Sequence, residues 1–316
     1  MRVLIASDHR YPASVGGPAG CRVLDFLAKG LAELGHTVFY YLEKDPPSLP
    51  LPAGVTYVTA PRWDVDMVHV RDYHVLDRLG PLPAPYLRTC HTDVAIYSMD
   101  RAINQEHCIY VSQNLARTYG RERFVHNGVD PSELLFRSKK RDYMLFVCGL
   151  DRAFQKGVER AVQVAKAAGL PLVVAGSSLK PEVNERFREF FREHGVRHVG
   201  EVYGTEKAKL FAYANAFLFP TRWNEGFGMV MAEALMSGTP VICSSLGACP
   251  EIVNEKVGFV CASDADYAEA ARRFGEISPR ACRDWAMEKF HHRVMAQGYV
   301  REYEAELGRR AAAATL

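Results

Sequence analysis

The sequence lacks several features that would indicate specialised classes of protein. Nowhere do about 18 apolar residues stand together, so no segment could form a membrane-spanning helix. None of the eight cysteines stands in a C-x2-C pair, which argues against a zinc ribbon or a thioredoxin-like redox site. Neither sign of charge dominates, because 39 Lys and Arg face 37 Asp and Glu, and we therefore expect no nucleic-acid partner. The apolar run at the N-terminus is too short for a signal peptide. We therefore expect a cytoplasmic protein, and peripheral membrane contact stays open.

What is present fits a folded enzyme of about two domains. The chain has 316 residues, which corresponds to two domains at roughly 150 residues each. Its 48% hydrophobic and 24% charged residues are ordinary for a soluble globular protein and exclude a mainly disordered chain. Most cysteines stand in apolar, strand-like stretches, so we expect them to be buried free thiols.

Strand-like and helix-like segments alternate in the first part of the chain. Leu24, Leu27 and Leu31 recur at helical spacing, and Gly35 ends that expected helix. Strands are expected at residues 3–6, 37–42, 55–58, 67–70, 86–90 and 108–111. Turn signals between residues 127 and 141 then indicate a boundary. The basic run Arg137, Lys139, Lys140 and Arg141 could bind nucleic acid, but we interpret it as a solvated linker.

A second alternation follows this boundary. Strands are expected at residues 143–148, 172–175, 197–199, 217–219 and 240–243, and helices at 158–168, 182–193, 207–214 and 229–236. Such alternation predicts parallel, doubly wound sheets, here two Rossmann-like α/β domains at residues 1–135 and 136–284 that face each other across a cleft. Residues 285–316 are expected to form a last amphipathic helix from Trp285, with an apolar face of Ala296, Val300, Tyr303 and Leu307.

The segment 224–233 carries the strongest signal for a ligand site, and it reads NEGFGMVMAE. It follows an expected strand and opens an expected helix, and open α/β sheets bind ligands at the carboxyl ends of their strands. Gly226 and Gly228 let backbone N–H groups approach a ligand, and a helix N-terminus favours a phosphate. Glu225 should lie before the helix, whereas Glu233 lies on it and could accept two hydrogen bonds from a vicinal diol such as a ribose. A carboxylate among apolar helix residues is costly unless it has a partner, which favours function over a solvent-facing role.

Two further loops between strand and helix could hold phosphate. In the loop 149–157, Arg152 and Lys156 could clamp a diphosphate. The pair Gly16-Gly17 precedes the first helix and could offer backbone contacts to a phosphate. Its spacing is not G-x-G-x-x-G directly after a strand, so we do not expect a NAD site.

His91 is the histidine that stands out, because it follows the strand expected at 86–90 and should lie at the mouth of the cleft. A structural or surface role is the alternative for it. The D-x-D triplets at 64–66 and 264–266 could hold a metal ion, but helix caps and loop charges explain them better. No Ser-His-Asp or P-loop pattern is visible in the sequence.

Together these motifs resemble the family 4 glycosyltransferases of the GT-B fold. Glu225 and Glu233 match the E-x7-E signature of that family, and the sequel Ser-Gly-Thr-Pro-Val at 237–241 is similar to the sequel found there. The remaining similarities are Gly16-Gly17, Gly35 to Val38, the segment Asn-Gly-Val-Asp at 127–130, and a closing helix with Phe290, Tyr299 and Tyr303. The resemblance covers most of the chain. It implies that the closing helix packs back on the N-terminal domain.

The resemblance also implies a reaction, the retaining transfer of a sugar from a nucleoside diphosphate donor. Glu233 would bind the donor ribose, and Glu225 would contact sugar hydroxyls near the reacting carbon. The other implied contacts are made by Arg152 and Lys156 to the diphosphate, by Gly16, Gly17, Gly226, Phe227, Gly228 and Met229 to the donor, and by His91 to the transferred sugar.

We expect neither a metal ion nor a cofactor, because guanidinium, ammonium and helix amides can stabilise a leaving diphosphate. The expected substrates are a nucleoside diphosphate sugar, with a UDP-sugar ahead of a GDP-sugar, and an acceptor hydroxyl on a small molecule, a glycan or a lipid-linked group. Two alternatives on the same fold stay open. They are a nucleotide-sugar epimerase or hydrolase, and a non-catalytic relative that binds nucleotide sugars.

Overall fold

The computed structural model describes residues 1–13, 19–43, 46–71, 73–93, 105 and 107–314. The chain forms two compact units. The N-terminal unit consists of Met1–Asp130 and Lys289–Leu316, and the C-terminal unit consists of Pro131–Glu288. From the sequence, we expect these boundaries after residues 135 and 284.

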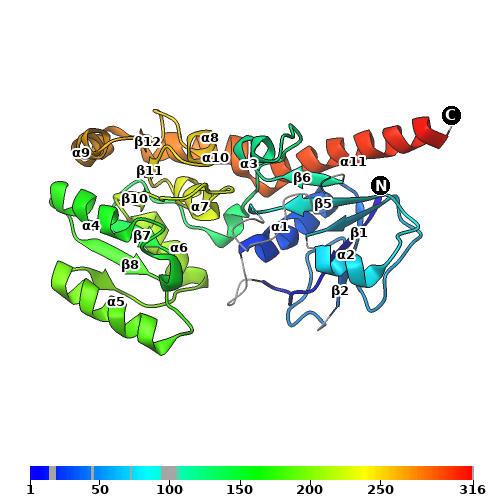
Figure 1. Cartoon of the computed structure of the whole chain (residues 1–316), viewed down its shortest axis with the longest axis horizontal. Coiled ribbons are helices and arrows are strands. Elements are labelled where there is room, and N and C mark those ends of the chain that lie inside the picture. The colour runs from blue at the N-terminus through cyan, green and yellow to red at the C-terminus, as the bar shows by residue number, and fades with distance from the viewer. Residues whose placement is uncertain (14–18, 44–45, 72, 94–104, 106, 315–316) are drawn as a thin grey trace. The chain divides into compact units, whose positions relative to one another are not determined.

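A six-stranded, fully parallel sheet forms the centre of the N-terminal unit (Figure 1). Its strands, in spatial order, are β3 (Val55–Val58), β2 (Thr37–Leu42), β1 (Arg2–Ser7), β4 (Met67–Val70), β5 (Tyr86–Cys90) and β6 (Cys108–Tyr110). The helices of this unit are α1 (Ala19–Glu33), α2 (Tyr73–Leu79), α3 (Gln113–Thr118) and α11 (His292–Ala314). The central strand β4 is buried along its whole length, as a parallel strand covered on both faces should be. The strand order reverses between β1 and β4, which confirms the predicted doubly wound sheet.

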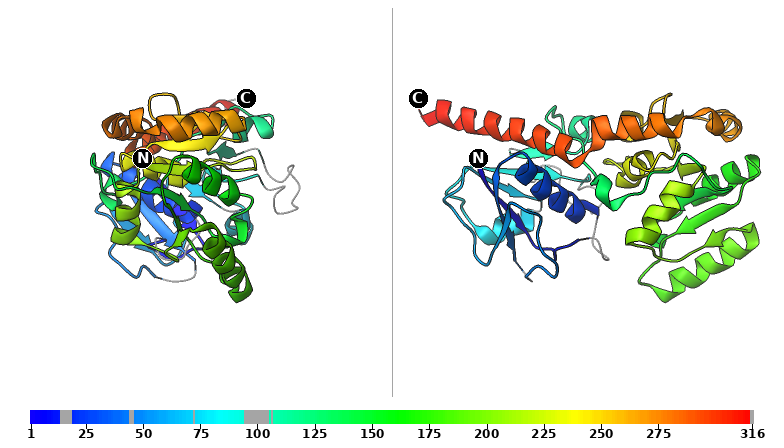
Figure 2. Two further views of the ribbon diagram at one scale, coloured as in Figure 1. Left: turned by 90° about the vertical axis from the view of Figure 1, so that its left-hand side faces the viewer. Right: turned by 180° about the vertical axis from the view of Figure 1, so that it is seen from behind.

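Helix α11 lies against α1 (Figure 2). A buried polar network anchors it to the sheet. The Nε2 atom of His69 on β4 lies 2.9 Å from Thr89 Oγ1, and its Nδ1 atom lies 2.8 Å from the hydroxyl of Tyr303. The same Thr89 oxygen lies 2.7 Å from the hydroxyl of Tyr299. Burial lowers the pKa of His69 to about 3, so its imidazole is neutral and uses one nitrogen as donor and the other as acceptor.

A second anchor joins the segment 127–130 to the start of α11. The Val129 N–H donates to the Phe290 carbonyl at 2.8 Å, and the His292 N–H donates to the Val129 carbonyl at 3.0 Å. Gly128 allows this approach, because a Cβ at that position would lie 2.6 Å from His292 Cα. These contacts give the Asn-Gly-Val-Asp segment a structural task within the N-terminal unit.

The C-terminal part of the chain is not a single helix from Trp285, which corrects the sequence analysis. Trp285 lies inside α10 (Pro279–Phe290), and α11 begins only at His292. The break coincides with the backbone pairing to Val129, a tertiary contact that no local pattern announces. Of the predicted apolar face, Ala296 and Tyr303 are buried, whereas Val300 and Leu307 are only partly buried. The buried side chains of α11 are His292, Met295, Ala296, Tyr299, Tyr303 and Glu306.

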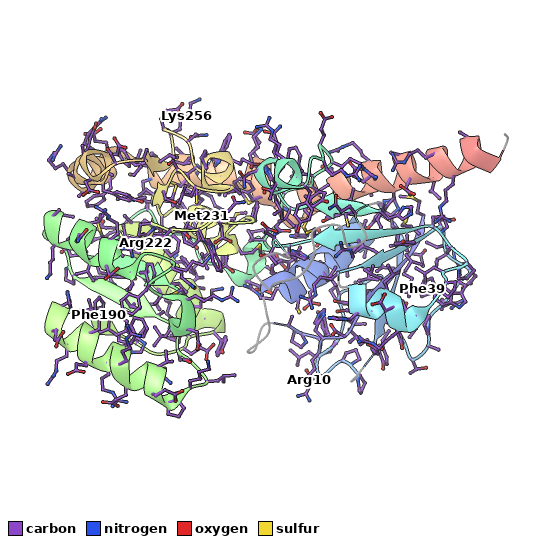
Figure 3. The ribbon with its side chains drawn as sticks, viewed as in Figure 1. Arg10, Phe39, Phe190, Arg222, Met231 and Lys256 are labelled. Carbon is purple, nitrogen blue, oxygen red and sulfur yellow. The ribbon has the colours of Figure 1, made fainter. Side chains whose placement is uncertain are left out.

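The C-terminal unit repeats the architecture with a second six-stranded parallel sheet. Its strands, in spatial order, are β12 (Gly258–Cys261), β11 (Val241–Ser244), β10 (Ala216–Phe219), β7 (Met144–Val147), β8 (Leu172–Ala175) and β9 (Arg197–His198). Its helices are α4 (Val158–Ala167), α5 (Pro181–His194), α6 (Gly204–Tyr213), α7 (Met229–Met236), α8 (Cys249–Ile252), α9 (Asp264–Arg273) and most of α10. Side chains from α4 and α5 cover one part of the sheet, and Phe190 of α5 is labelled in Figure 3.

The basic run before β7 is only partly a solvated linker. Lys140 turns inward, and its Nζ donates to the Ala212 carbonyl at 2.9 Å, to Thr239 Oγ1 at 2.9 Å and to the Ser237 carbonyl at 3.3 Å. Ala212 lies near the end of α6 and Ser237 caps the end of α7, where carbonyl groups lack helical partners and favour a cation. Lys140 therefore holds two helix ends together.

The predictions about the cysteines and the D-x-D triplets are confirmed. All eight cysteines are free, and seven are buried, with Cys148 partly buried. The triplet 264–266 begins α9, where Ser263 and Asp266 form a capping box. Asp64 pairs with Arg62 on the surface. In the part of the chain that the structure describes, no helix is long and apolar enough to cross a membrane.

Candidate functional site

The site of the C-terminal unit lies at the carboxyl ends of β7 and β10, where the strand order of the sheet reverses. Such a switch point is where open α/β sheets bind ligands. The loops that follow these two strands are in direct contact. Gly157 has a φ of +84°, and a Cβ there would lie 2.0 Å from the Pro220 carbonyl oxygen, so a residue with a side chain does not fit. The Arg222 N–H donates to the Gln155 carbonyl at 2.8 Å, and Arg222 is labelled in Figure 3.

Lys156 and Glu225, which are 69 residues apart, meet between these loops. The ammonium of Lys156 forms an ion pair with Oε2 of Glu225. The exposed fraction of each side chain is 14%. The indole N–H of Trp223 donates to the same oxygen at 3.0 Å. Lys156 Nζ also lies 4.3 Å from the centre of the Trp223 ring and 5.1 Å from that of Phe219. The site therefore combines a cation, a carboxylate and an aromatic face.

Arg152 adds a second cation at the rim of the same cluster. It ends a short 3-10 turn, Leu150–Arg152, that follows β7. Its side chain is exposed, and its Cζ lies 5.1 Å from the centre of the Trp223 ring. Lys156 and Arg152 thus both contact Trp223, with the ammonium more deeply placed than the guanidinium.

The segment 226–229 forms the N-terminus of α7 beside this cluster. Gly228 is the N-cap of the helix and has a φ of +85°. A Cβ there would lie 2.6 Å from the end of the Met231 side chain, which Figure 3 labels. Phe227 is buried, and Gly226 precedes it. The first N–H groups of a helix have no partners within the helix, so this end of α7 can accept an anion.

Glu233, one turn from the end of α7, is buried with an exposed fraction of 1%. Its Oε1 accepts a hydrogen bond from Lys207 Nζ on α6 at 2.8 Å, and the Lys207 side chain is 20% exposed. This burial rules out the solvent-facing interpretation of Glu233. It also means that a ribose diol could bind this oxygen only by sharing it with Lys207 or displacing Lys207 from it.

A third loop fixes the backbone of Glu225. The Ala248 N–H, after β11, donates to the Glu225 carbonyl at 2.9 Å. Gly247 has a φ of +62°, and a Cβ there would lie 2.2 Å from the Glu225 nitrogen. The loop after β11 therefore holds the backbone of Glu225, and Lys156 and Trp223 contact its carboxylate.

The N-terminal unit holds the remaining predicted site residues. Gly16 and Gly17 lie outside the described residues. His91 follows β5, and its ring packs against Gly20 in the first turn of α1, where a Cβ would lie 3.3 Å from the ring. Burial and the positive charge of Arg71 lower the pKa of His91 to about 3, so the ring is neutral. Its Nε2 is buried without a hydrogen-bond partner among the residues described.

Serine, histidine and aspartate do come together in this unit, although the sequence shows no such pattern. Ser7 Oγ lies against His9 Nδ1, and His9 Nε2 lies 3.1 Å from Asp25 Oδ1, which also accepts a hydrogen bond from the Tyr40 hydroxyl at 2.6 Å. Burial opposes a charged imidazole here, but hydrogen bonds with Asp25 and Cys21 outweigh it and raise the pKa of His9 to about 9. Ser7 is only 1% exposed, and the group joins the end of β1 to α1.

The structure thus brings Arg152, Lys156 and Glu225 together in one cluster of the C-terminal unit. Trp223 contacts Glu225 of this cluster, and Lys207 contacts Glu233. Neither residue is among those expected from the sequence. Trp223 had a local signal, since it is one of three tryptophans and stands two residues before Glu225. Lys207 had none, because its contact with α7 depends on how two helices pack. No group of three or more His, Cys, Asp or Glu side chains among the described residues is arranged to hold a metal ion.

Comparisons with known proteins show which proteins the chain resembles. Residues 133–286 match the family described as glycosyl transferases group 1. A glycosyltransferase of Methanocaldococcus jannaschii is 28% identical over 196 residues, which are 52% of this chain and 49% of that protein. The chain spans about half the length of the first curated relatives that it matches.

Solved structures extend the similarity over nearly the whole chain. AviGT4, a glycosyltransferase involved in avilamycin A biosynthesis, is 27% identical with a TM-score of 0.78, covering 97% of this chain and 98% of that one. Anabaena HepE, solved with UDP and glucose, has the same fold at 14% identity, with a TM-score of 0.71 over 96% of this chain and 100% of that one. The expected resemblance is confirmed: the two units have the GT-B fold, and residues 133–286 match the glycosyl transferases group 1 family.

Proposed function

We propose that this protein transfers a sugar from a nucleoside diphosphate sugar to an acceptor hydroxyl, with retention of configuration and without a metal ion. The observation that supports this most is the cluster of Lys156, Arg152 and Glu225 beside the N-terminus of α7. It places cations and helix amides where a diphosphate could bind and a carboxylate where sugar hydroxyls could bind. A UDP-sugar is the first choice of donor, and the fold relative HepE was solved with UDP and with UDP-glucose.

In this proposal the cationic side chains, and not a metal ion, stabilise the charge on the leaving diphosphate. Negative charge grows on the diphosphate as the bond to the sugar breaks, and Lys156, Arg152 and the α7 amides stabilise it. Lys156 is paired with Glu225 in this structure, so its ammonium turns from the carboxylate to the diphosphate when the donor binds. The acceptor attacks the face that the diphosphate leaves, and a phosphate oxygen takes the acceptor proton. Chelation by EDTA should then leave activity intact, and a loss restored by Mn²⁺ or Mg²⁺ would contradict the metal-free mechanism.

The two glutamates have separable roles in this proposal. Glu233 contacts the ribose, which does not change during reaction, so Glu233→Gln should weaken UDP and UDP-sugar alike, roughly ten- to hundredfold. Glu225 contacts the transferred sugar, so Glu225→Gln should leave UDP affinity nearly unchanged and lower turnover. Calorimetry with UDP and kinetics with the donor measure the two effects. Loss of UDP binding in Glu225→Gln but not in Glu233→Gln would show that the roles are reversed.

Donor choice and reaction type are tested on the wild-type protein. UDP-, GDP- and ADP-sugars are compared by thermal shift, since a bound donor stabilises the fold by mass action. Turnover of the preferred donor is then measured with and without a panel of acceptors. Transfer only with an acceptor supports the proposal, whereas turnover without one indicates a hydrolase or epimerase. Binding without any turnover indicates a non-catalytic relative.

Lys156→Ala tests directly whether the Lys156 ammonium stabilises the leaving diphosphate. Because the ammonium matters more as charge develops than in the ground state, turnover should fall by roughly two to three orders of magnitude. An unchanged turnover in a folded variant would remove Lys156 from the mechanism.

A further inference from the structure

Trp223 occupies the centre of the site cluster and has no role in the mechanism so far. Its indole N–H donates to Glu225 Oε2 at 3.0 Å, and Lys156 contacts that same oxygen. Lys156 Nζ and Arg152 Cζ lie 4.3 Å and 5.1 Å from the centre of its ring. One side chain therefore contacts both cations of the clamp and the carboxylate, through two different kinds of interaction.

The two donors on Glu225 Oε2 differ in mobility. Lys156 has a flexible four-carbon side chain, whereas an indole has only two side-chain torsions. The loop that carries Trp223 is also fixed on both sides. Arg222 donates to the Gln155 carbonyl before it, and the Glu225 carbonyl accepts from Ala248 after it.

We propose that Trp223 is a positioning residue that holds the Glu225 carboxylate in place when Lys156 turns from it to the diphosphate. The inference rests on the proposed function for the movement of Lys156. In the free protein both donors share one oxygen. With the donor bound, the indole keeps the carboxylate oriented toward the sugar, and the aromatic face that Lys156 and Arg152 contact keeps both cations beside the diphosphate.

Two substitutions separate the contribution of the indole N–H from that of the aromatic ring. Trp223→Phe keeps an aromatic face and removes the N–H donor, whereas Trp223→Leu removes both. The matched control is Trp285→Phe, because Trp285 is in the same unit and its indole N–H donates at 3.0 Å to a backbone carbonyl, that of Ile252, instead of to a carboxylate. Loss of a hydrogen bond to a charged group should lower the turnover of Trp223→Phe roughly ten- to hundredfold, with UDP affinity within about twofold of wild type. Trp223→Leu should in addition weaken UDP binding, and Trp285→Phe should change neither.

A double-mutant cycle distinguishes positioning from a general structural effect. In the Glu225→Gln background the carboxylate is absent, so Trp223→Phe should cost less than about threefold in turnover. The same cost in both backgrounds, or a Trp223→Phe variant as active as wild type, would overturn the inference.

A spectroscopic measurement tests the contact even if the protein transfers no sugar. Labelling tryptophan with ¹⁵N gives three indole N–H signals, one for each tryptophan, which the Phe variants assign. The Trp223 signal should shift in Glu225→Gln, and the Trp285 signal should not. On addition of UDP, the chemical shift of the Trp223 indole N–H should stay typical of a hydrogen-bonded group. If the Trp223 signal does not shift in Glu225→Gln, the inference is refuted. If it shifts as expected but the protein transfers no sugar, only the proposed function is refuted.

Discussion

Substitution of His69 by Gln should change how the stability of the N-terminal unit depends on pH. The imidazole is buried between Thr89 and Tyr303, and its pKa is lowered to about 3 by that burial. Glutamine keeps one donor and one acceptor for the two neighbours but has no group that titrates. The other groups that face the ring, Thr89, Tyr299 and Tyr303, all stay neutral in acid.

The sign and size of the effect follow from the two pKa values of His69. In the unfolded chain the imidazole takes up a proton near its ordinary value of 6.5, whereas in the folded unit it stays neutral down to about 3. Stability is therefore full above pH 6.5 and is lost as the pH falls below it, by about 1.4 kcal/mol per pH unit. At pH 4.5 the wild type should have lost about 2.7 kcal/mol through His69. His91 is present in both proteins, and burial is the main cause of its lowered pKa, so most of its contribution cancels in the comparison.

Hydrogen exchange of the peptide that covers β4, in the full chain, measures the opening of this unit at each pH. The advantage of wild type over His69→Gln should shrink by about 2.7 kcal/mol between pH 7.5 and pH 4.5. Tyr303→Phe is the control, because it removes the hydroxyl at Nδ1 but leaves the buried imidazole. It should cost about 1 kcal/mol at pH 7.5 and keep the slope of the wild type. If His69→Gln also keeps that slope, the buried imidazole is not the cause of the acid sensitivity.

Three further changes give separate tests. Gly247→Ala forces a Cβ to within 2.2 Å of the Glu225 nitrogen at a φ of +62°, so it should cost more than about 1 kcal/mol and lower turnover together with thermal stability. A Cβ at position 30 would lie 2.8 Å from Ala296 Cβ of α11, so the larger side chain of Gly30→Leu should displace α11 more than that of Gly30→Ser. Limited proteolysis should therefore cleave α11 faster in Gly30→Leu. Asp25→Asn removes the partner that holds the pKa of His9 at about 9. The wild type should lose about 3 kcal/mol as the pH rises from 6.5 through 9, and an Asp25→Asn variant with the same loss would contradict that assignment.

The site was predictable from the sequence where its residues lie close together along the chain. The segment 224–233 follows an expected strand and contains a glycine loop and the start of an expected helix, and the structure has these elements in that order. The meeting of Lys156 with Glu225 was predictable in outline, since both follow strands, and the carboxyl ends of parallel strands share one edge of a sheet. The sequence could not show that the two side chains form an ion pair.

The sequence alone determined the two doubly wound units, because burial on both faces makes each parallel strand a short apolar run that can be read locally. It also pointed to Gly226, Gly228, Glu225 and Glu233, around α7, as candidate ligand-binding residues. Only the tertiary structure decided which side chains meet across elements, namely Trp223 with Glu225 and Lys207 with Glu233. It also decided that α11 begins at His292, where the backbone pairs with Val129. Such contacts depend on the distances and directions of side chains from separate elements, and no spacing along the chain encodes them.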